Sequence, residues 1–469
     1  MTNRRRATPA YRILLAAAMG VCLTTACGVV PGGSGGGGTL TVVTFAPMDT
    51  KATNMPGMPG MAKAYERWVN SNGGINGRKL RVLTCNEKNT ATGAADCARK
   101  AISEKAVAVV GSYSQHGRAF MAPLEAEGIP FIGGYGVSAE EFQSTLSYPV
   151  NGGQPALLAG AGHQLGRACS QVALVRPDTL AGDSMPVLLN AGLKANRIPE
   201  ADDIRAAEDA ADLAPQAREA LAGTPAPTGG PTTGATGSPS SSASTPATGS
   251  TSKDGTAKGD TSAAAKDTGP KDNKSCVAAV LGARTETFFD SFRRIDAQGS
   301  RKNPQISSVL GSVSQSLVDR TGGKESPLEG AFITSWYPVA GDPLWAPMRK
   351  VISEQAFGDD TVDPDDSGAQ TTWIAYSVLT EIVQRFKKDE DVTARKVARA
   401  LNQSSSVKTG GLTPDLSWRY QDMRAVAGFP RLVNGRVTFQ IVQAGRLVAQ
   451  PGEQSLDMTQ TLEQAPRST

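Results

Sequence analysis

The chain has 469 residues, with 48 basic residues, 44 acidic residues and 2 histidines, and its formal charge is +4. Four of the 48 basic residues lie within residues 1–26, and the 44 that follow balance the 44 acidic residues. The basic pI is therefore no argument for a nucleic acid or an anionic surface as the partner. Because histidine is so rare and no CxxC pair occurs, we expect neither a metal site nor another cofactor.

Residues 1–26 have the features of an export signal. Four arginines precede an apolar run that is too short to span a bilayer, and the segment ends in LTTA before Cys27. This ending resembles the lipobox of bacterial lipoproteins, whose cysteine is acylated and becomes the mature N-terminus. We expect Cys27 to anchor the protein at the extracytoplasmic face of the cell membrane, with residues 27–38 forming the lipidated end and a flexible tether. Secretory and twin-arginine export both remain open.

The first part of the mature chain alternates strands and helices. We predict strands at 39–45, 79–85, 106–113 and 129–136, and helices at 61–69, 91–105 and 117–128. This alternation, with β-branched strands, is typical of a doubly wound parallel sheet. Gly73 and Gly74 are expected to end the first helix, because a helix C-cap often needs positive φ.

A second series of the same kind follows. We predict helices at 155–168, 185–195, 213–223 and 285–299, and strands at 171–175, 276–282 and 305–311, with a weak edge strand near 203–207. Residues 222–275 interrupt the series and contain no Val, Ile, Leu, Met or aromatic residue. Such a segment cannot bury enough apolar area to fold. We expect a long disordered insert within the second series and no domain boundary there.

Several segments in order resemble one family. GGINGRKLRV, AVAVVGSYSQ, LEAEGIPFIGGYG and VKTGGLTPDLSW look like the extracytoplasmic solute-binding proteins of branched-chain amino acid ABC transporters. The resemblance runs from about residue 39 to 448. It implies the type I periplasmic-binding fold, an α/β architecture in which two doubly wound lobes are joined by three crossovers and close over a ligand. It also implies a monomer, an ABC permease as partner, and no enzyme activity.

The resemblance divides the chain into segments. The first lobe would comprise residues 39–150 and 339–430, and the second lobe residues 151–338 and 431–455, followed by a tail at 456–469. The fold also implies the disulfides, which an oxidising exterior favours. Cys169 and Cys276 would pair because each lies just before one of two neighbouring parallel strands, and Cys85 and Cys97 would pair across a strand-to-helix turn.

Ligand-binding residues are expected where the parallel strands end at their carboxyl side, because helix N-termini there favour acceptors and anions. The side chains and loops that follow these strands supply the candidates, and serines among them are also common helix caps. The predicted ligand-binding residues are Asn54, Ser112, Tyr113, Ser114, Gln115, Tyr135, Gly136, Ser138, Gln154, Arg284 and Thr285.

The ligand itself is expected to be small and polar but not a simple apolar amino acid. Family members that bind branched-chain amino acids hold the ammonium with carboxylates of the second lobe and the carboxylate with hydroxyl and N–H groups of the first. Here the acidic position falls on Ser312 or Val313, and the aromatic position falls on Ala283 or Arg284. An ammonium group would be poorly held without a carboxylate. A negatively charged ligand is expected if Arg284 lines the cleft.

Three other functions are considered beside solute binding for transport. A sensory binding lipoprotein without transport would have the same sequence features. A copper site is conceivable because Met55, Met58 and Met61 are spaced three apart and thioethers select Cu(I), although a helix start can bury such residues. Gly182, Asp183 and Ser184 spell an esterase signature, but neither histidine has the context that this chemistry needs.

Overall fold

The computed structural model describes residues 38–465, except 52, 180, 223–273, 297–304, 310–312, 425 and 427. The expected signal, the lipidated Cys27, most of the insert and Ser312 lie outside the described residues. The described residues form one compact unit. Within the described residues, none of the helices has both the length and the apolar composition of a membrane span.

The first sheet has the strand order β2-β1-β3-β4-β5, and all its described pairings are parallel. Its strands are β1 (Leu40–Ala46), β2 (Leu80–Asn86), β3 (Ala108–Val110), β4 (Phe131–Ile132) and β5 (Ser147–Tyr148). The helices that accompany it are α1 (Gly57–Ser71), α2 (Ala91–Ser103), α3 (Gly117–Glu127), α4 (Glu140–Gln143), α10 (Ala346–Gln355), α11 (Ser367–Gln384) and α12 (Ala394–Gln403).

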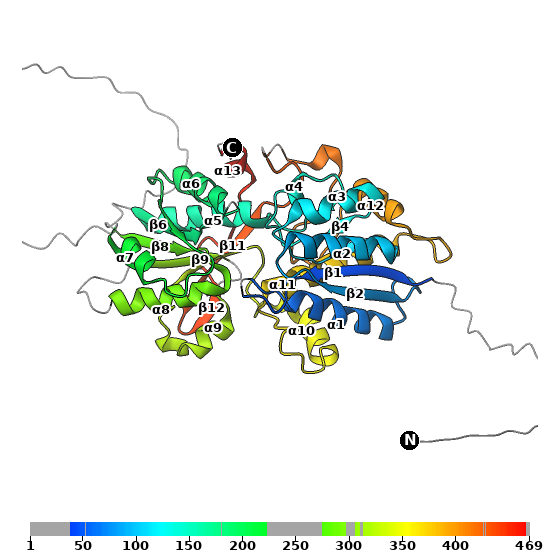
Figure 1. Cartoon of the computed structure of the whole chain (residues 1–469), viewed down its shortest axis with the longest axis horizontal. Helices are drawn as coiled ribbons and strands as arrows, with labels where there is room; N and C mark the ends of the chain where they lie inside the picture. Colours follow the sequence, from blue (N-terminus) through cyan, green and yellow to red (C-terminus); the bar gives the residue numbers. More distant parts are fainter. Residues whose placement is uncertain are drawn as a thin grey trace, which may run out of the picture. The chain divides into compact units, whose positions relative to one another are not determined.

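Alternating side chains of β1 explain why this sheet carries helices on both faces. Val42 and Ala46 pack in the core on the α1 and α11 side, whereas Val43 and Phe45 pack with the apolar residues of α2 and α3. A strand that is buried on both faces is apolar along most of its length. Figure 1 shows α1 and α2 on opposite sides of β1.

The second sheet continues the same design with antiparallel strands at one edge. The order is β12-β11-β10-β9-β8-β6-β7, and β13 also pairs with β11. Its strands are β6 (Gln171–Pro177), β7 (Asp202–Ala206), β8 (Ser275–Ala279), β9 (Gln305–Val309), β10 (Phe332–Ser335), β11 (Arg436–Gln443), β12 (Arg446–Ala449) and β13 (Ser455–Asp457). Its helices are α5 (Gly153–Ala168), α6 (Met185–Ala195), α7 (Ala214–Ala222), α8 (Thr285–Asp296), α9 (Gln315–Arg320) and α13 (Thr459–Glu463).

Both sheets have the doubly wound parallel order that the sequence predicts, which confirms the predicted α/β fold class. The second sheet differs from the first at one edge, because β11 pairs antiparallel with β10 and β12 pairs antiparallel with β11. The lobe boundaries that the resemblance implies remain predictions. We refer below to the first sheet with its helices as lobe one and to the second sheet with its helices as lobe two.

The turn after α1 needs glycine for a steric reason. The helix ends at Ser71, and Gly74 N donates to Val69 O at 2.9 Å while both Gly73 and Gly74 have positive φ. A Cβ on Gly74 would collide with the carbonyl oxygen of Arg78. The predicted helix end is therefore correct, and Gly74 is required by the close approach of the chain on its way to β2.

Both predicted disulfides are present. Cys85 of β2 bonds to Cys97 of α2, and the Cα atoms are 5.7 Å apart. Cys169 at the end of α5 bonds to Cys276, with a Cα separation of 6.0 Å across 107 residues of sequence. The prediction that Cys276 precedes its strand is wrong, because Cys276 lies inside β8 and pairs in register with Val172 of β6.

Candidate functional site

A cavity of about 260 Å³ lies where strands of both sheets end at their carboxyl side. Loops after β1, β3 and β4 line it from lobe one, and loops after β6, β7 and β8 line it from lobe two. The residues from the first sheet and its helices are Thr53, Asn54, Met55, Tyr113, Gln115, Tyr135, Val137, Asp366 and Ser367. The others are Gln154, Leu157, Leu158, Pro177, Thr179, Ala181, Met185, Glu208, Val280, Leu281, Gly282, Arg284, Val309 and Trp336.

Three aromatic side chains form one wall of this cavity. The ring centroids of Tyr113 and Tyr135 are 5.2 Å apart, and those of Tyr135 and Trp336 are 5.1 Å apart. Hydrogen bonds fix the rings, since Tyr135 Oη lies 2.7 Å from Ser367 Oγ and Trp336 Nε1 donates to Gly153 O at 2.9 Å. Burial raises the pKa of Tyr113 to about 12, so its hydroxyl stays protonated. This aromatic wall offers apolar faces to a ligand.

Six of the predicted ligand-binding residues line the cavity. They are Asn54, Tyr113, Gln115, Tyr135, Gln154 and Arg284. Most of their polar atoms already have partners: the Asn54 amide bonds to the backbone of Thr50, and Gln115 Nε2 donates to Tyr113 Oη at 3.1 Å. Gln154 differs, because its side-chain amide has no hydrogen-bonding partner among the residues that the structure describes. It is the amide best placed to bind a ligand.

The predicted serines after β3 do not line the cavity. Ser112 is fully buried, and its Oγ accepts a hydrogen bond from Phe45 N at 3.0 Å. Ser114 is also fully buried, and its Oγ donates to a carboxylate oxygen of Glu87 at 3.1 Å. These hydroxyl groups connect the loop after β3 to β1 and to the end of β2, so the structure does not bring them to the cavity.

The predicted Gly136 and Ser138 are likewise absent from the cavity wall. Their backbone N–H groups, together with that of Val137, donate to the carboxyl group of Glu141 at 2.9–3.0 Å. Ser138 Oγ also donates to this carboxyl group, at 3.1 Å. Burial raises the pKa of Glu141 to about 7, although the donated hydrogen bonds oppose that shift.

The two predicted residues after β8 have different positions. Arg284 lines the cavity, and its guanidinium group donates to Ala207 O and Ala210 O at 2.6 Å each. These bonds connect the loop after β8 to the segment after β7. Because both acceptors are neutral carbonyl groups, the bonds do not neutralise the positive charge of Arg284. Thr285 is fully buried outside the cavity wall, and its Oγ1 has no hydrogen-bonding partner among the described residues.

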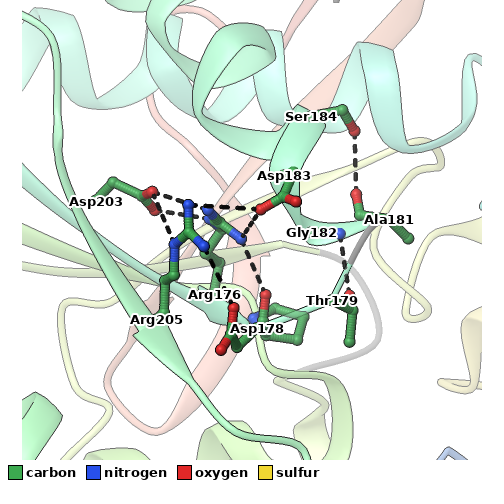
Figure 2. Close-up of polar contacts among 10 residues, drawn as sticks. Arg176, Asp178, Thr179, Ala181, Gly182, Asp183, Ser184, Asp203 and Arg205 are labelled. Carbon is green, nitrogen blue, oxygen red and sulfur yellow. Dashed lines mark hydrogen bonds and ion pairs between the residues drawn. The ribbon is translucent and has the colours of Figure 1, made fainter.

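A network of charged residues supports the lobe-two wall between β6 and α6. Arg176 is 1% exposed and donates two hydrogen bonds to Asp203, at 2.7 and 2.8 Å, while its Nη1 lies 3.0 Å from Asp183. Figure 2 shows Arg176 between these two aspartates, with Arg205 beside them. Gly182 N donates to Thr179 Oγ1 at 3.0 Å within the same loop. The network thus holds Thr179 at the cavity.

This network also accounts for the segment that resembles an esterase signature. Asp183 is engaged with Arg176, and Ser184 Oγ donates to Ala181 O at 3.1 Å. His163 pairs instead with Glu453 at 2.9 Å. The described residues contain no group of three or more His, Cys, Asp or Glu side chains that could hold a metal ion. Met58 and Met61 are fully buried in the core, as a helix start predicts.

Sequence reasoning missed Trp336, Asp366 and Ser367 as cavity residues. Asp366 caps α11 by accepting a hydrogen bond from Ala369 N at 2.6 Å, and it also lines the cavity. Burial raises its pKa to about 6. Asp366 and Ser367 also line an adjoining cavity of about 250 Å³ that contains Asp363 and Asp365. The available signal in the sequence is the residue type of Asp366, because aspartate is a common N-cap and the apolar residues of α11 follow it.

Comparison with known proteins identifies the family. A family model described as periplasmic binding protein matches residues 46–429, which is most of the chain. The chain belongs to the periplasmic binding protein family. It is a periplasmic ligand-binding protein of the ABC transporter substrate-binding type. None of the curated proteins matches the sequence.

Solved structures of low sequence identity share the fold. A possible leucine/isoleucine/valine-binding protein from Rhodopirellula baltica is 13% identical with a TM-score of 0.64, covering 90% of this chain and 97% of that one. A fatty acid ABC transporter substrate-binding protein from Thermomonospora curvata is 14% identical with a TM-score of 0.62, covering 91% and 95%. A Rhodopseudomonas palustris solute-binding protein in complex with benzoate is 14% identical with a TM-score of 0.61, covering 89% and 97%. The family and these neighbours are ligand-binding proteins and not enzymes.

Proposed function

We propose that this protein is an extracytoplasmic solute-binding lipoprotein that captures a small molecule between its two lobes and delivers it to an ABC transporter permease. The cavity of about 260 Å³, lined by strand-end loops of both sheets, is the observation that carries this proposal. Ligands of doubly wound sheets bind outside the carboxyl ends of the strands. Residues from both lobes at one cavity would couple ligand binding to closure of the lobes.

The composition of the cavity wall narrows the expected ligand. Apolar and aromatic side chains predominate, with a few polar groups that include Gln154, Thr179 and Arg284. We therefore propose a ligand with an apolar body and a single polar group, in place of the generally polar ligand that the sequence suggested. The benzoate complex and the fatty acid transporter protein among the structural neighbours agree with such a ligand.

A thermal-shift screen of the purified mature chain tests this function. Amino acids, peptides, organic acids, fatty acids and sugars are added in turn, and a compound that binds only the folded state raises the melting temperature by mass action. Gln154→Ala is expected to reduce the shift caused by any active compound, because Gln154 lines the cavity. Tyr420→Ala is the control, since Tyr420 is 91% exposed. The absence of any stabilising compound would contradict the proposal.

Transport and sensing share this binding step and need a separate experiment. Uptake of the radiolabelled ligand by cells that lack the protein is expected to fall, whereas a purely sensory protein would leave uptake unchanged. For the membrane anchor, Cys27→Ser is expected to release the protein from the membrane fraction and to abolish incorporation of labelled palmitate. Wild-type protein that fractionates as soluble would rule out the anchor.

A further inference from the structure

In the loop after β4, the carboxyl group of Glu141 lies where the acid group of a ligand would be expected, and we call it the internal occupant. Successive backbone N–H groups that converge on one point form an anion-binding concavity. Here the N–H groups of Gly136, Val137 and Ser138 converge on the carboxyl group of Glu141. Ser138 Oγ adds a fourth hydrogen bond at 3.1 Å, and Glu141 is 2% exposed. These donors cannot serve a ligand while Glu141 holds them.

The chain is shaped to accommodate this carboxyl group. Gly134 has no side chain, and a Cβ at that position would collide with Glu141 Oε2. The loop after β3 shows the same kind of arrangement, because Ser114 Oγ donates to the fully buried Glu87. Both loops of lobe one that were expected to bind a ligand acid group therefore direct their donors to carboxylates of the chain itself.

The charged residues of the cavity wall are Asp366 from lobe one and Glu208 and Arg284 from lobe two. Asp366 lies beside Tyr135 and Ser367 and would repel a ligand carboxylate there. Arg284 is the one basic residue among the described residues of the wall, so it is the group that can attract a ligand carboxylate. A guanidinium group has five N–H donors, and the two bonds to Ala207 O and Ala210 O leave others for a ligand.

We propose that the cavity selects an apolar carboxylate without an ammonium group, with its apolar body against Tyr113, Tyr135 and Trp336 and its carboxylate beside Arg284. This proposal rests on the proposed function and names the ligand class. It reverses the polarity that the resemblance to amino acid binders implies, in which lobe one holds the carboxylate. Glu141 takes the place that the ligand acid group would have had.

A matched set of probes tests the ligand class by calorimetry on the mature chain. The probes are 3-phenylpropanoate, which has only the carboxylate, 2-phenylethylamine, which has only the ammonium group, and L-phenylalanine, which has both. We expect 3-phenylpropanoate to bind at least tenfold more tightly than either of the others. Equal or tighter binding of L-phenylalanine or of the amine would overturn the proposal.

The position of the carboxylate is tested by substitution. Arg284→Met is expected to weaken binding of 3-phenylpropanoate at least tenfold, while Arg294→Met, which removes an exposed arginine of α8 outside the cavity wall, leaves it unchanged. Equal effects of the two substitutions would overturn the assignment of Arg284. If the probes fail but a sugar or peptide stabilises the protein in the screen above, the ligand class is wrong and the binding function stands. If no compound binds at all, the binding function itself fails.

Chemical rescue tests the role of Glu141 as the internal occupant. Glu141→Ala opens the concavity, and at pH 8 sodium acetate is expected to raise the melting temperature of this variant more than sodium chloride does. Wild type and Glu140→Ala, a substitution at the neighbouring residue of α4, are expected to respond to the two salts alike. An equal acetate response in all three proteins would contradict the role of Glu141. The Arg284 comparison remains decisive even if Glu141→Ala does not fold.

Discussion

Asp366 combines a structural and an electrostatic role at one position of the cavity. Its carboxylate caps α11, and burial raises its pKa from 3.8 to about 6, with the nearby Asp363 adding to the shift. The folded protein therefore binds a proton at Asp366 more tightly than the unfolded chain does. The stability that this proton affinity contributes is present below about pH 4 and is lost as the pH rises through 6.

Asp366→Asn provides the test, because asparagine also caps helices but does not titrate. We expect the free energy of unfolding of wild type, relative to the variant, to decrease between pH 4 and pH 7. Urea unfolding at several pH values measures it. Asp342→Asn is the control at another cap, where Asp342 accepts from Leu344 N at 2.8 Å. A wild-type-to-variant difference that stays constant over this range would disprove the pKa shift.

Arg176 and Arg205 belong to one network but differ in burial, and this difference predicts different energies. Arg176 is 1% exposed, whereas Arg205 is 57% exposed and its ion pairs are longer than 3.4 Å. Removing one partner of a buried ion pair leaves an uncompensated charge, so Arg176→Met should lower the free energy of unfolding by about 3 kcal/mol. This value is at the lower end of the range for buried pairs, because Asp203 is partly hydrated. Arg205→Met should cost less than about 1 kcal/mol. Chemical denaturation measures both, and similar costs would contradict the prediction.

At the scale of elements, each disulfide joins a different pair of neighbours. Cys85–Cys97 connects β2 to α2 across 12 residues, and Cys169–Cys276 connects the end of α5 to β8 across 107 residues. In the chain-entropy model a longer closed loop stabilises more, by roughly 2 kcal/mol between these two lengths. We expect the double Cys→Ala variant of the longer loop to lose more unfolding free energy than that of the shorter loop. Guanidinium titrations compare the two, and the opposite order would contradict the loop-length argument.

The secondary-structure elements also show how much of the fold and of the cavity wall can be predicted from the sequence. The alternation of strands and helices follows from patterns along the chain, because apolar runs mark the parallel strands. The strand order and the disulfide pairing follow from the fold that the resemblance implies, in which β6 and β8 are neighbours. The structure places Ser112 and Ser114 outside the cavity wall, and their position after a strand does not reveal the partners that hold them there. Those partners, Phe45 N and Glu87, are distant in sequence. Pairing of this kind depends on tertiary contacts that no local pattern records.

At the scale of the whole molecule, lobe one depends on two distant parts of the chain. Tyr65 of α1 packs against Trp373 and Tyr376 of α11 with ring centroids 5.3 and 5.2 Å apart. Tyr376 Oη also lies 2.8 Å from Thr44 Oγ1 of β1. The last third of the chain therefore completes the core of the first sheet. It also supplies Asp366 and Ser367 to the cavity, which explains why sequence reasoning about strand ends missed them.

Truncation tests this dependence. A chain that ends at residue 338 lacks α10, α11 and α12 and would expose the apolar face of α1, so we expect it to lose cooperative thermal unfolding and near-ultraviolet circular dichroism. A chain that ends at residue 465 is the control and should unfold as wild type does. A cooperative transition in the shorter chain would show that the first sheet folds without α11.

The Cys169–Cys276 bridge has a consequence for a chain that is cut. The bond connects α5, which precedes residues 223–273, to β8, which follows them, so a protease that cleaves within that segment produces two fragments that remain covalently joined. Such a nicked protein would migrate as one band on a gel without reductant and as two bands with it. Its cavity would keep contributions from both fragments, and limited digestion need not end ligand binding.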